Sequence, residues 1–283
     1  NARQIIIPHR ACNVVFSIDE VLPRLAKAKV FSTADATSGY WHCQLDKESR
    51  PLTTFETPFG RHRFCRLAMG LSPSPEIFMA KMHETLVGLN GIACIADDIL
   101  IFGCGETMEE ASADHDRNLL SLLERCRERN LHLNKDKLQL RRESTIFMGH
   151  ELTKEGFRPD KRKVGAIVNM PPPSDRPGVM RLLGMGTFLA RYSLHFTEVT
   201  APLRELLTKE NEFRWEDDKH GKAFRQLKEM LVTAPVLGYY DVTKPVVVQA
   251  DASSTGLGAA ILEDGKPIEY ASRAMTPTER DTY

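Results

Sequence analysis

The pattern of apolar and polar residues predicts an α/β body, a helix-rich middle and a short β-rich end. Short apolar runs and alternating stretches predict strands at residues 30–35, 52–55, 63–67, 145–152 and 156–159, and two strands within 92–102 that meet at Ala96-Asp97-Asp98. Helical spacing predicts helices from residue 17 to about 28, from 75 to about 89, and over 113–130. A loop is expected at 103–110, and residues 40–45 fit either a strand or the start of a helix.

The pattern changes twice in the second half of the chain. The prolines at 171–173 and 177 form the strongest linker signal. A helical region follows from residue 179 to about 231, and residues 246–251, 256–262 and 267–271 then predict three successive antiparallel strands. The body therefore extends to about residue 170, and a third unit begins near residue 245.

Composition narrows the class of protein. With 283 residues and 42% hydrophobic residues, the chain suits about two globular domains and excludes a disordered protein. Lys+Arg and Asp+Glu are 38 each, so any nucleic-acid surface must come from local clusters. No apolar run approaches the ~20 residues of a membrane span, so we expect no membrane partner. The first residue is not Met, and we expect the chain to be the middle of a longer one.

The cysteines point to an intracellular protein. The six cysteines are scattered and form no Cys-x-x-Cys pair, which disfavours a disulfide scaffold or a zinc ribbon. The nine histidines show no His-Glu-x-x-His spacing, which disfavours a zinc hydrolase.

Three aspartates carry the most informative chemistry. Asp35 ends a predicted apolar strand, and Asp97-Asp98 stand where residues 92–102 turn between two apolar strands. A bare carboxylate among apolar groups costs several kcal/mol unless it is paired, protonated or metal-bound. The Asp-Asp pair alone fits a simple turn as well as a site, but Asp35 favours magnesium, which prefers oxygen ligands. Two such ions about 3.5–4 Å apart activate a hydroxyl and stabilise a leaving group.

An ordered series of motifs resembles the Pol polyprotein of gypsy-type long-terminal-repeat retrotransposons, in its reverse transcriptase and the start of its ribonuclease H. The matching segments are FSTADATSGYW at 31–41, LTTF at 52–55, TPFG at 57–60, RLAMGLSPSPEIF at 66–78, IADDIL at 95–100, LHLNKDK at 131–137, FMGH at 147–150, APVL at 234–237 and QADAS at 249–253. A lone Asp-Asp is weak evidence, whereas this order over nearly the whole chain is specific.

The resemblance implies an α+β right-hand polymerase. It implies partial fingers and palm over residues 1–152, a helix-rich thumb and connection over 153–242, and a truncated ribonuclease H-like domain over 243–283. The roles that it implies are two catalytic Mg²⁺ ions (or Mn²⁺) on three aspartates, nucleotide binding, a primer grip and an incomplete ribonuclease H metal site. The aspartates that hold the catalytic ions would be Asp35, Asp97 and Asp98, and the nucleotide would contact Ala36, Tyr40, Met69 and Gly70. Met148 and Gly149 would form the primer grip, and Asp251 would belong to the incomplete ribonuclease H site.

Plainer interpretations stand beside several of these roles. Tyr40 would be a steric gate that excludes a ribose 2′-OH, or else an ordinary half-buried aromatic residue. Gly70 would allow close approach of the incoming base pair, or would only begin a helix. Met148 and Gly149 would place the primer end or form a plain hairpin turn, and Lys137 would assist the pyrophosphate or be a solvated lysine.

The basic runs also have two interpretations. They contain Lys135, Lys137, Arg141 and Arg142, then Arg158, Lys161, Arg162 and Lys163. They would contact phosphates, or form a solvated face.

The chain departs from the family pattern at a few motif positions. Ile95 replaces the Tyr of the retroviral Asp-Asp box, Ala68 and Met69 replace a usual Pro and a Gln or Phe, and Cys43-Gln44 replace a more apolar pair. These departures leave the metal ligands intact but bear on the fit of the template and on activity.

The resemblance implies an RNA-directed DNA polymerase within a multifunctional polyprotein that also serves ribonuclease H and DNA integration. Its partners would be RNA and DNA template-primers and deoxynucleoside triphosphates, in the cytoplasm (in a virus-like particle), the nucleus or both. The alternative is a catalytically inactive relic or a domesticated nucleic-acid-binding protein. The second ribonuclease H carboxylate is expected beyond Tyr283, so residues 1–283 are not expected to cleave an RNA–DNA hybrid.

Overall fold

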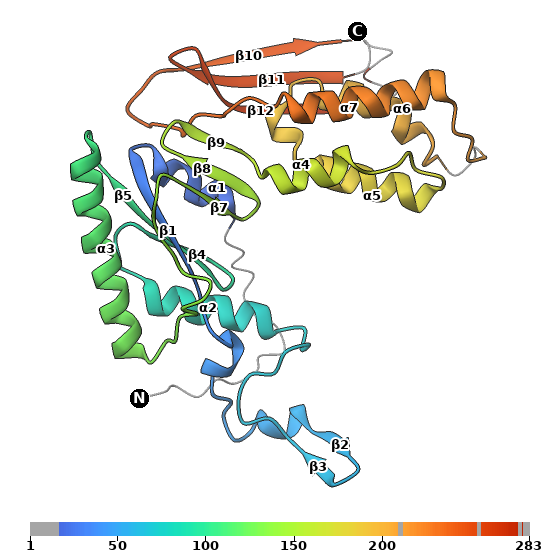
Figure 1. The fold of residues 1–283 in the computed structure, drawn as a ribbon. Helices are drawn as coiled ribbons and strands as arrows, with labels where there is room; N and C mark the ends of the chain where they lie inside the picture. Colours follow the sequence, from blue (N-terminus) through green and yellow to red (C-terminus); the bar gives the residue numbers. More distant parts are fainter. Residues whose placement is uncertain (1–16, 209–211, 254–255, 277–278, 280–283) are drawn as a thin grey trace. The chain divides into compact units, whose positions relative to one another are not determined.

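The computed structural model describes residues 17–208, 212–253, 256–276 and 279 (Figure 1). The chain divides into two compact units, residues 1–148 and 149–283. In the described part, no helix is both long and apolar enough to cross a membrane.

A four-stranded antiparallel sheet forms the centre of the first unit, with the strand order β4-β5-β1-β6. Its strands are β1 (Ala28–Asp35), β4 (Ile92–Ile95), β5 (Asp98–Cys104) and β6 (Gln139–Arg142). The pairing of β1 with β5 runs from Ala28 opposite Cys104 to Asp35 opposite Asp98. This register brings two of the predicted metal-binding carboxylates to the same end of neighbouring strands.

Two helices pack against this sheet, α2 (Ser74–Leu86) and α3 (Met108–Arg129) (Figure 1). Their shared core includes Phe78, Ile99 and Leu122, which are nearly or fully buried. The predicted loop at 103–110 was too long, because α3 begins at Met108. Thr107 and Glu110 form a capping box there, which satisfies two backbone N–H groups at the start of the helix.

Strand β6 was not expected from the sequence, and the turn at Met148 and Gly149 divides the strand expected at 145–152 into two. Most of the other errors in the first unit lie at element ends. A short helix, α1 (Ile18–Val21), passes into a 3-10 helix at Leu22–Leu25, because Pro23 cannot continue the α-helical bonding. The expected strands around residues 57–60 lie closer to the turn, as β2 (Phe55–Thr57) and β3 (Gly60–His62), and the earlier one is partly replaced by a 3-10 helix at Arg50–Thr53. Residues 40–45 begin as a 3-10 helix at Gly39–His42, and β7 (Ser144–Phe147) ends the unit.

The second unit begins with a hairpin and continues mainly as helices. The hairpin pairs β8 (His150–Thr153) with β9 (Gly156–Pro159). The helices are α4 (Lys161–Val168), α5 (Arg176–Thr187), α6 (Phe196–Glu205) and α7 (Lys222–Val232), with a 3-10 turn at Ala190–Tyr192 and a π-helical turn at Asp217–Gly221. Phe157 and Tyr192 lie in its buried core. Helix α4 was not expected from the sequence, and α5 begins at the predicted linker.

A three-stranded antiparallel sheet follows, with the order β10-β11-β12. Its strands are β10 (Val246–Ala252), β11 (Gly256–Glu263) and β12 (Lys266–Ala274), which match the three predicted strands within a few residues. Strand β12 packs against α6, where the hydroxyl groups of Ser272 and Thr197 lie 2.9 Å apart. The apolar run Val246-Val247-Val248 predicts a buried strand, but β10 is exposed along its whole length.

Candidate active site

The end of the β1–β5 pair carries the candidate site. Asp35 is the last residue of β1, and its pairing partner Asp98 is the first residue of β5. Asp97 lies in the tight turn between β4 and β5, where Ala96 has a positive φ of 55°. The carbonyl oxygen of Asp97 accepts a hydrogen bond of 3.2 Å from the backbone N–H of Ala36, which ties the turn to the end of β1.

One lysine partly balances the charge of these carboxylates. The Nζ atom of Lys137 donates to Oδ2 of Asp35 at 2.8 Å, although the two residues are 102 positions apart. This hydrogen bond and the charge of Asp35 raise the pKa of Lys137. Partial burial, followed by the charges of Asp97 and Asp35, raises the pKa of Asp98, while Lys137 acts in the opposite direction. The site therefore concentrates more negative charge than Lys137 neutralises, as expected of a site for cations.

The segment that carries Lys137 is tied to the end of β1 by its backbone. The N–H of Asn134 donates to the carbonyl oxygen of Asp35 at 2.8 Å, and the N–H of Thr37 donates to the carbonyl oxygen of His132 at 2.8 Å. These two bonds fix the segment beside the carboxylates. The side chain of Lys137 is 61% exposed and that of Asp35 is 14% exposed, so the long side chain approaches a nearly buried carboxylate from solvent.

A cavity of about 280 Å³ opens beside these groups. It is lined by Asp35, Ala36, Ser38, Gly39, Tyr40, Met69, Pro75, Phe78, Met79, Ala96, Asp97, Asn134 and Lys137. The structure thus brings together five of the predicted residues, Asp35, Ala36, Tyr40, Met69 and Asp97. Asp98 is held next to them by the strand register. Gly70 follows Met69 with a φ of 84° and open space where a Cβ atom would lie.

The ring of Tyr40 is held by a neighbour that the sequence did not single out. Phe78 on α2 is 4% exposed, and its ring centroid lies 5.2 Å from that of Tyr40. A Cβ atom on Gly39 would approach Cζ of Phe78 to 2.5 Å, so this position has no room for a side chain unless the ring moves. The glycine therefore allows the close contact that positions the tyrosine.

The other predicted residues lie at the boundary between the units and in the second unit. Met148 and Gly149 form the turn between β7 and β8, and both have positive φ angles, 50° and 81°. A Cβ atom on Gly149 would meet Nζ of Lys163 at 2.1 Å, and this ammonium group lies 3.8 Å from the ring centroid of Phe188. The turn is real, and its role as a primer grip stays a prediction.

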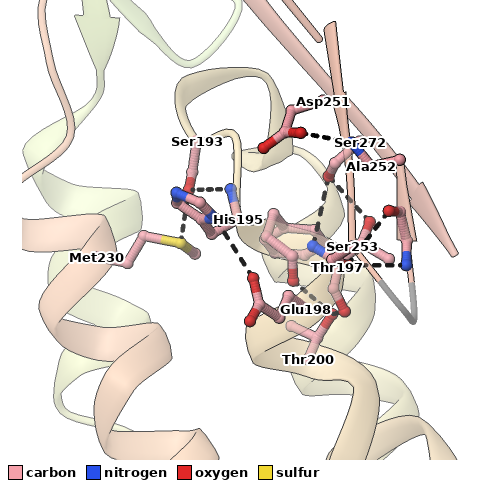
Figure 2. Close-up of polar contacts among 12 residues, drawn as sticks. Ser193, His195, Thr197, Glu198, Thr200, Met230, Asp251, Ala252, Ser253 and Ser272 are labelled. Atoms are coloured by element: carbon pink, nitrogen blue, oxygen red, sulfur yellow. Dashed lines mark hydrogen bonds and ion pairs between the residues drawn. The ribbon is translucent and has the colours of Figure 1, made fainter. Parts of the chain in front are cut away.

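Asp251 lies near the end of β10 (Figure 2). Its carboxylate accepts a hydrogen bond of 2.9 Å from the backbone N–H of Ala252. A hollow of about 80 Å³ beside it is lined partly by His195, Glu198 and Ser272. The imidazole of His195 contacts the carboxylate of Glu198 at 3.3 Å (Figure 2).

The oxygen donors in the first unit suit magnesium better than a soft metal. Within the described ranges, no group of three His, Cys, Asp or Glu side chains converges closely enough to hold a metal ion alone. Mg²⁺ does not need such a cage, because it keeps several waters and takes one or two carboxylates together with substrate phosphates. A cationic Lys137 on Asp35 shows that this carboxylate accepts positive charge. The residues present therefore fit Mg²⁺ that is completed by a nucleotide.

Sequence reasoning missed a buried polar network behind the site. Oγ of Ser32 lies 2.7 Å from Nε2 of His115, and both residues are fully buried. Nδ1 of His115 lies 3.2 Å from Asp116, which also binds the guanidinium group of Arg141. The backbone N–H of Arg141 donates to Oγ of Ser32 at 2.9 Å. The burial of its hydroxyl group excludes Ser32 as an accessible nucleophile, so the network ties β1, α3 and β6 together.

Four of the eight residues in the basic runs form ion pairs with carboxylates. The pairs are Lys137 with Asp35, Arg141 with Asp116, Arg158 with Glu151 and Arg162 with Asp160. In the free protein, these four basic side chains therefore contact carboxylates of the chain itself.

Comparison with known proteins identifies the family. The family model for reverse transcriptase (RNA-dependent DNA polymerase) matches residues 3–152, and the model for the RNase H-like domain found in reverse transcriptase matches residues 215–282. The chain belongs to the reverse transcriptase family.

Relatives and solved structures agree. The chain is 32% identical over 268 residues to the retrovirus-related Pol polyprotein from transposon 412 of Drosophila melanogaster, covering 93% of this chain and 21% of that protein. It is 30% identical over 281 residues to the Pol polyprotein from transposon gypsy of the same organism, covering 94% and 26%. A foamy viral protease-reverse transcriptase in complex with double-stranded DNA matches with a TM-score of 0.86 and 26% identity, covering 96% of this chain and 48% of that one.

These matches confirm the predicted family and its right-hand polymerase fold. The chain spans about a fifth to a quarter of the length of these Pol polyproteins. Reverse transcriptase and ribonuclease H-like domains depend in general on divalent metal ions. The limits of the predicted fingers, thumb and ribonuclease H parts stay a prediction.

Proposed function

We propose that this chain carries the polymerase site of a retrotransposon reverse transcriptase and extends a primer with deoxynucleotides on an RNA or DNA template. The observation that carries the proposal is the register of Asp35 opposite Asp98 at a cavity that also contains Asp97, Tyr40 and Lys137. Family membership supports the same reaction. Since the chain is only part of its relatives, its activity, template and primer are parts of the proposal.

Asp35, Asp97 and Asp98 would hold two Mg²⁺ ions, with Mn²⁺ as a substitute. When bound, such ions activate the primer 3′-hydroxyl and stabilise the leaving pyrophosphate. The strand ladder holds the backbones of Asp35 and Asp98 in place before substrate binds, so only their side chains need to adjust to the ions.

The remaining roles concern the incoming nucleotide and the primer. The ring of Tyr40 would lie beneath the sugar and exclude a ribose 2′-hydroxyl, with Ala36, Met69 and Gly70 shaping the neighbouring wall. The Met148-Gly149 turn would hold the primer end. Most of the rate enhancement would come from positioning and charge neutralisation, as in other phosphoryl transfers.

Primer extension tests the proposal, run on residues 1–283 and on a longer Pol segment that contains them. Asp97→Asn removes a charge and keeps the shape of the side chain, so we expect extension by the active form to fall by at least about 100-fold. Asp136→Asn is a matched control, because Asp136 is exposed and does not line the cavity. If Asp97→Asn extends primers as well as the unchanged protein, the metal assignment is wrong. If neither unchanged form extends a primer but both bind it, an inactive nucleic-acid-binding relic is the better conclusion.

The second unit would contribute the beginning of a ribonuclease H. Asp251 would be its first metal ligand, but a two-metal hydrolysis needs several carboxylates. We therefore expect residues 1–283 to leave the RNA of an RNA–DNA hybrid intact. Magnesium-dependent cleavage that Asp251→Asn abolishes would contradict this expectation.

A further inference from the structure

Two lysines stand two residues apart in the segment between α3 and β6, and they differ in their contacts. Lys137 donates to Asp35 at 2.8 Å, whereas Lys135 is exposed and does not line the cavity. The backbone carbonyl oxygen of Asp35 also binds this segment, because it accepts a hydrogen bond from the N–H of Asn134. The contact between Lys137 and Asp35 is therefore built into the way the segment returns to the sheet.

We propose that Lys137 is an internal counterion that occupies Asp35 in the metal-free protein and is displaced when a divalent cation binds. The inference rests on the proposed role of Asp35 as a metal ligand. It assigns Lys137 a role before the reaction, in controlling how tightly the free site binds metal.

Electrostatics favours such an exchange. Three carboxylates at the end of the β1–β5 pair repel one another, and the ammonium group of Lys137 relieves part of that repulsion. A divalent ion at the same carboxylate carries twice the charge and accepts several oxygen ligands, so it competes with a single ammonium group. The flexible lysine can leave at little cost because its side chain is 61% exposed, whereas Asp35 is fixed at the end of a strand.

The displaced ammonium group stays close to the site. The backbone of its segment remains bound to β1 through the N–H groups of Asn134 and Thr37. Lys137 lines the same cavity as Tyr40, where a nucleotide would lie. The same charge that weakens metal binding in the empty site would then face the phosphates of an incoming nucleotide.

Binding of Mn²⁺ alone tests the proposal, measured by electron paramagnetic resonance on the full chain without nucleotide or primer. Lys137→Gln should tighten Mn²⁺ binding by roughly three- to tenfold at low salt, because it removes one positive charge a few ångströms from the ion. Lys137→Arg keeps the charge and should bind Mn²⁺ like the unchanged protein. Lys135→Gln removes the same charge from the same segment and should change the affinity by less than about twofold.

Two further measurements separate an ion exchange from a change in folding. The advantage of Lys137→Gln should shrink as salt rises, since screening weakens the competing charge. Circular dichroism should show the same secondary structure for all variants, and Lys137→Met serves as a second neutral variant if Lys137→Gln is poorly folded. Unchanged or weaker Mn²⁺ binding by a folded neutral variant overturns the proposal.

The outcome is distinguishable from a failure of the proposed function. If Asp97→Asn abolishes primer extension but the neutral Lys137 variants bind Mn²⁺ like the unchanged protein, only the counterion role is wrong. If Asp35→Asn leaves both Mn²⁺ affinity and primer extension unchanged, the metal assignment and the counterion role are both wrong.

Discussion

Removing the hydroxyl group of Ser32 is a sharp test of how the site is supported. With a neutral imidazole, the network is self-consistent only if Nδ1 of His115 donates to Asp116, which leaves Nε2 to accept from Ser32. Ser32 then donates one bond, and its oxygen accepts another from the backbone N–H of Arg141. Ser32→Ala removes both at once.

The expected cost follows from the burial of these groups. A buried polar atom that loses its partner costs about 1–3 kcal/mol. Here Nε2 of the fully buried His115 loses its donor, and the backbone N–H of Arg141 loses its acceptor. We expect Ser32→Ala to lower the free energy of unfolding of the first unit by about 2–4 kcal/mol. At about 2–4 °C per kcal/mol, this corresponds to a fall in Tm of roughly 4–16 °C.

Urea unfolding measures this loss. Trp41 lies in the first unit and Trp215 in the second, so a Trp215→Phe background leaves Trp41 as the only reporter. Ser121→Ala is the matched control, because Ser121 lies on the exposed side of the same α3 that carries His115, and its effect should stay within about 0.5 kcal/mol. A loss below about 0.5 kcal/mol for Ser32→Ala would refute the reasoning.

Three further outcomes are expected. Phe78→Leu should lower the discrimination against ribonucleotides by about tenfold, because Tyr40 loses the ring that holds it. The enzyme should still use deoxynucleotides, and the ratio of kcat/KM values for the two nucleotides measures the effect. Iodoacetamide at pH 8 should modify the exposed Cys65 well before Cys43, because burial raises the pKa of the Cys43 thiol to about 11. Peptide mapping of the modified protein would show the order. Two hydrogen bonds from Arg158 lower the pKa of Glu151 in the folded protein. The ionised carboxylate therefore stabilises the fold above pH ~4.5, and this stabilisation is lost as the pH falls through the lower folded pKa. In acid unfolding, Glu151→Gln should remove that part of the pH dependence.

The sequence predicted the carboxylates because their signal is local. Asp35 and Asp97-Asp98 interrupt apolar runs, and the short turn between β4 and β5 fixes where Asp98 begins its strand. Long strands with apolar patterns were predicted within a few residues for the same reason. The family pattern supplied the order in which these pieces follow one another.

The contacts that hold the site could not be predicted in this way. Lys137 reaches Asp35 across 102 positions, and Ser32 reaches His115 across 83, so no periodicity in the sequence links them. The start of α3 was different, because the signal was present: Thr107 followed by Glu110 is a capping box, and it marks a helix start at Met108.

The carboxylates of the site stand on paired strands, whereas Lys137 stands on an irregular segment, and this difference affects how the site responds to charge. Asp35 and Asp98 stand on a ladder of antiparallel bonds, which holds their backbones at neighbouring positions before anything binds. Lys137 stands on an irregular segment that is held by its backbone, which leaves its side chain free to change partners. Changes in charge at the site can therefore be absorbed by one lysine side chain without moving the strands. A substitution in the ladder or in the network of Ser32 and His115 should then alter stability and activity together, whereas a neutral residue at position 137 should change metal affinity and leave stability unchanged.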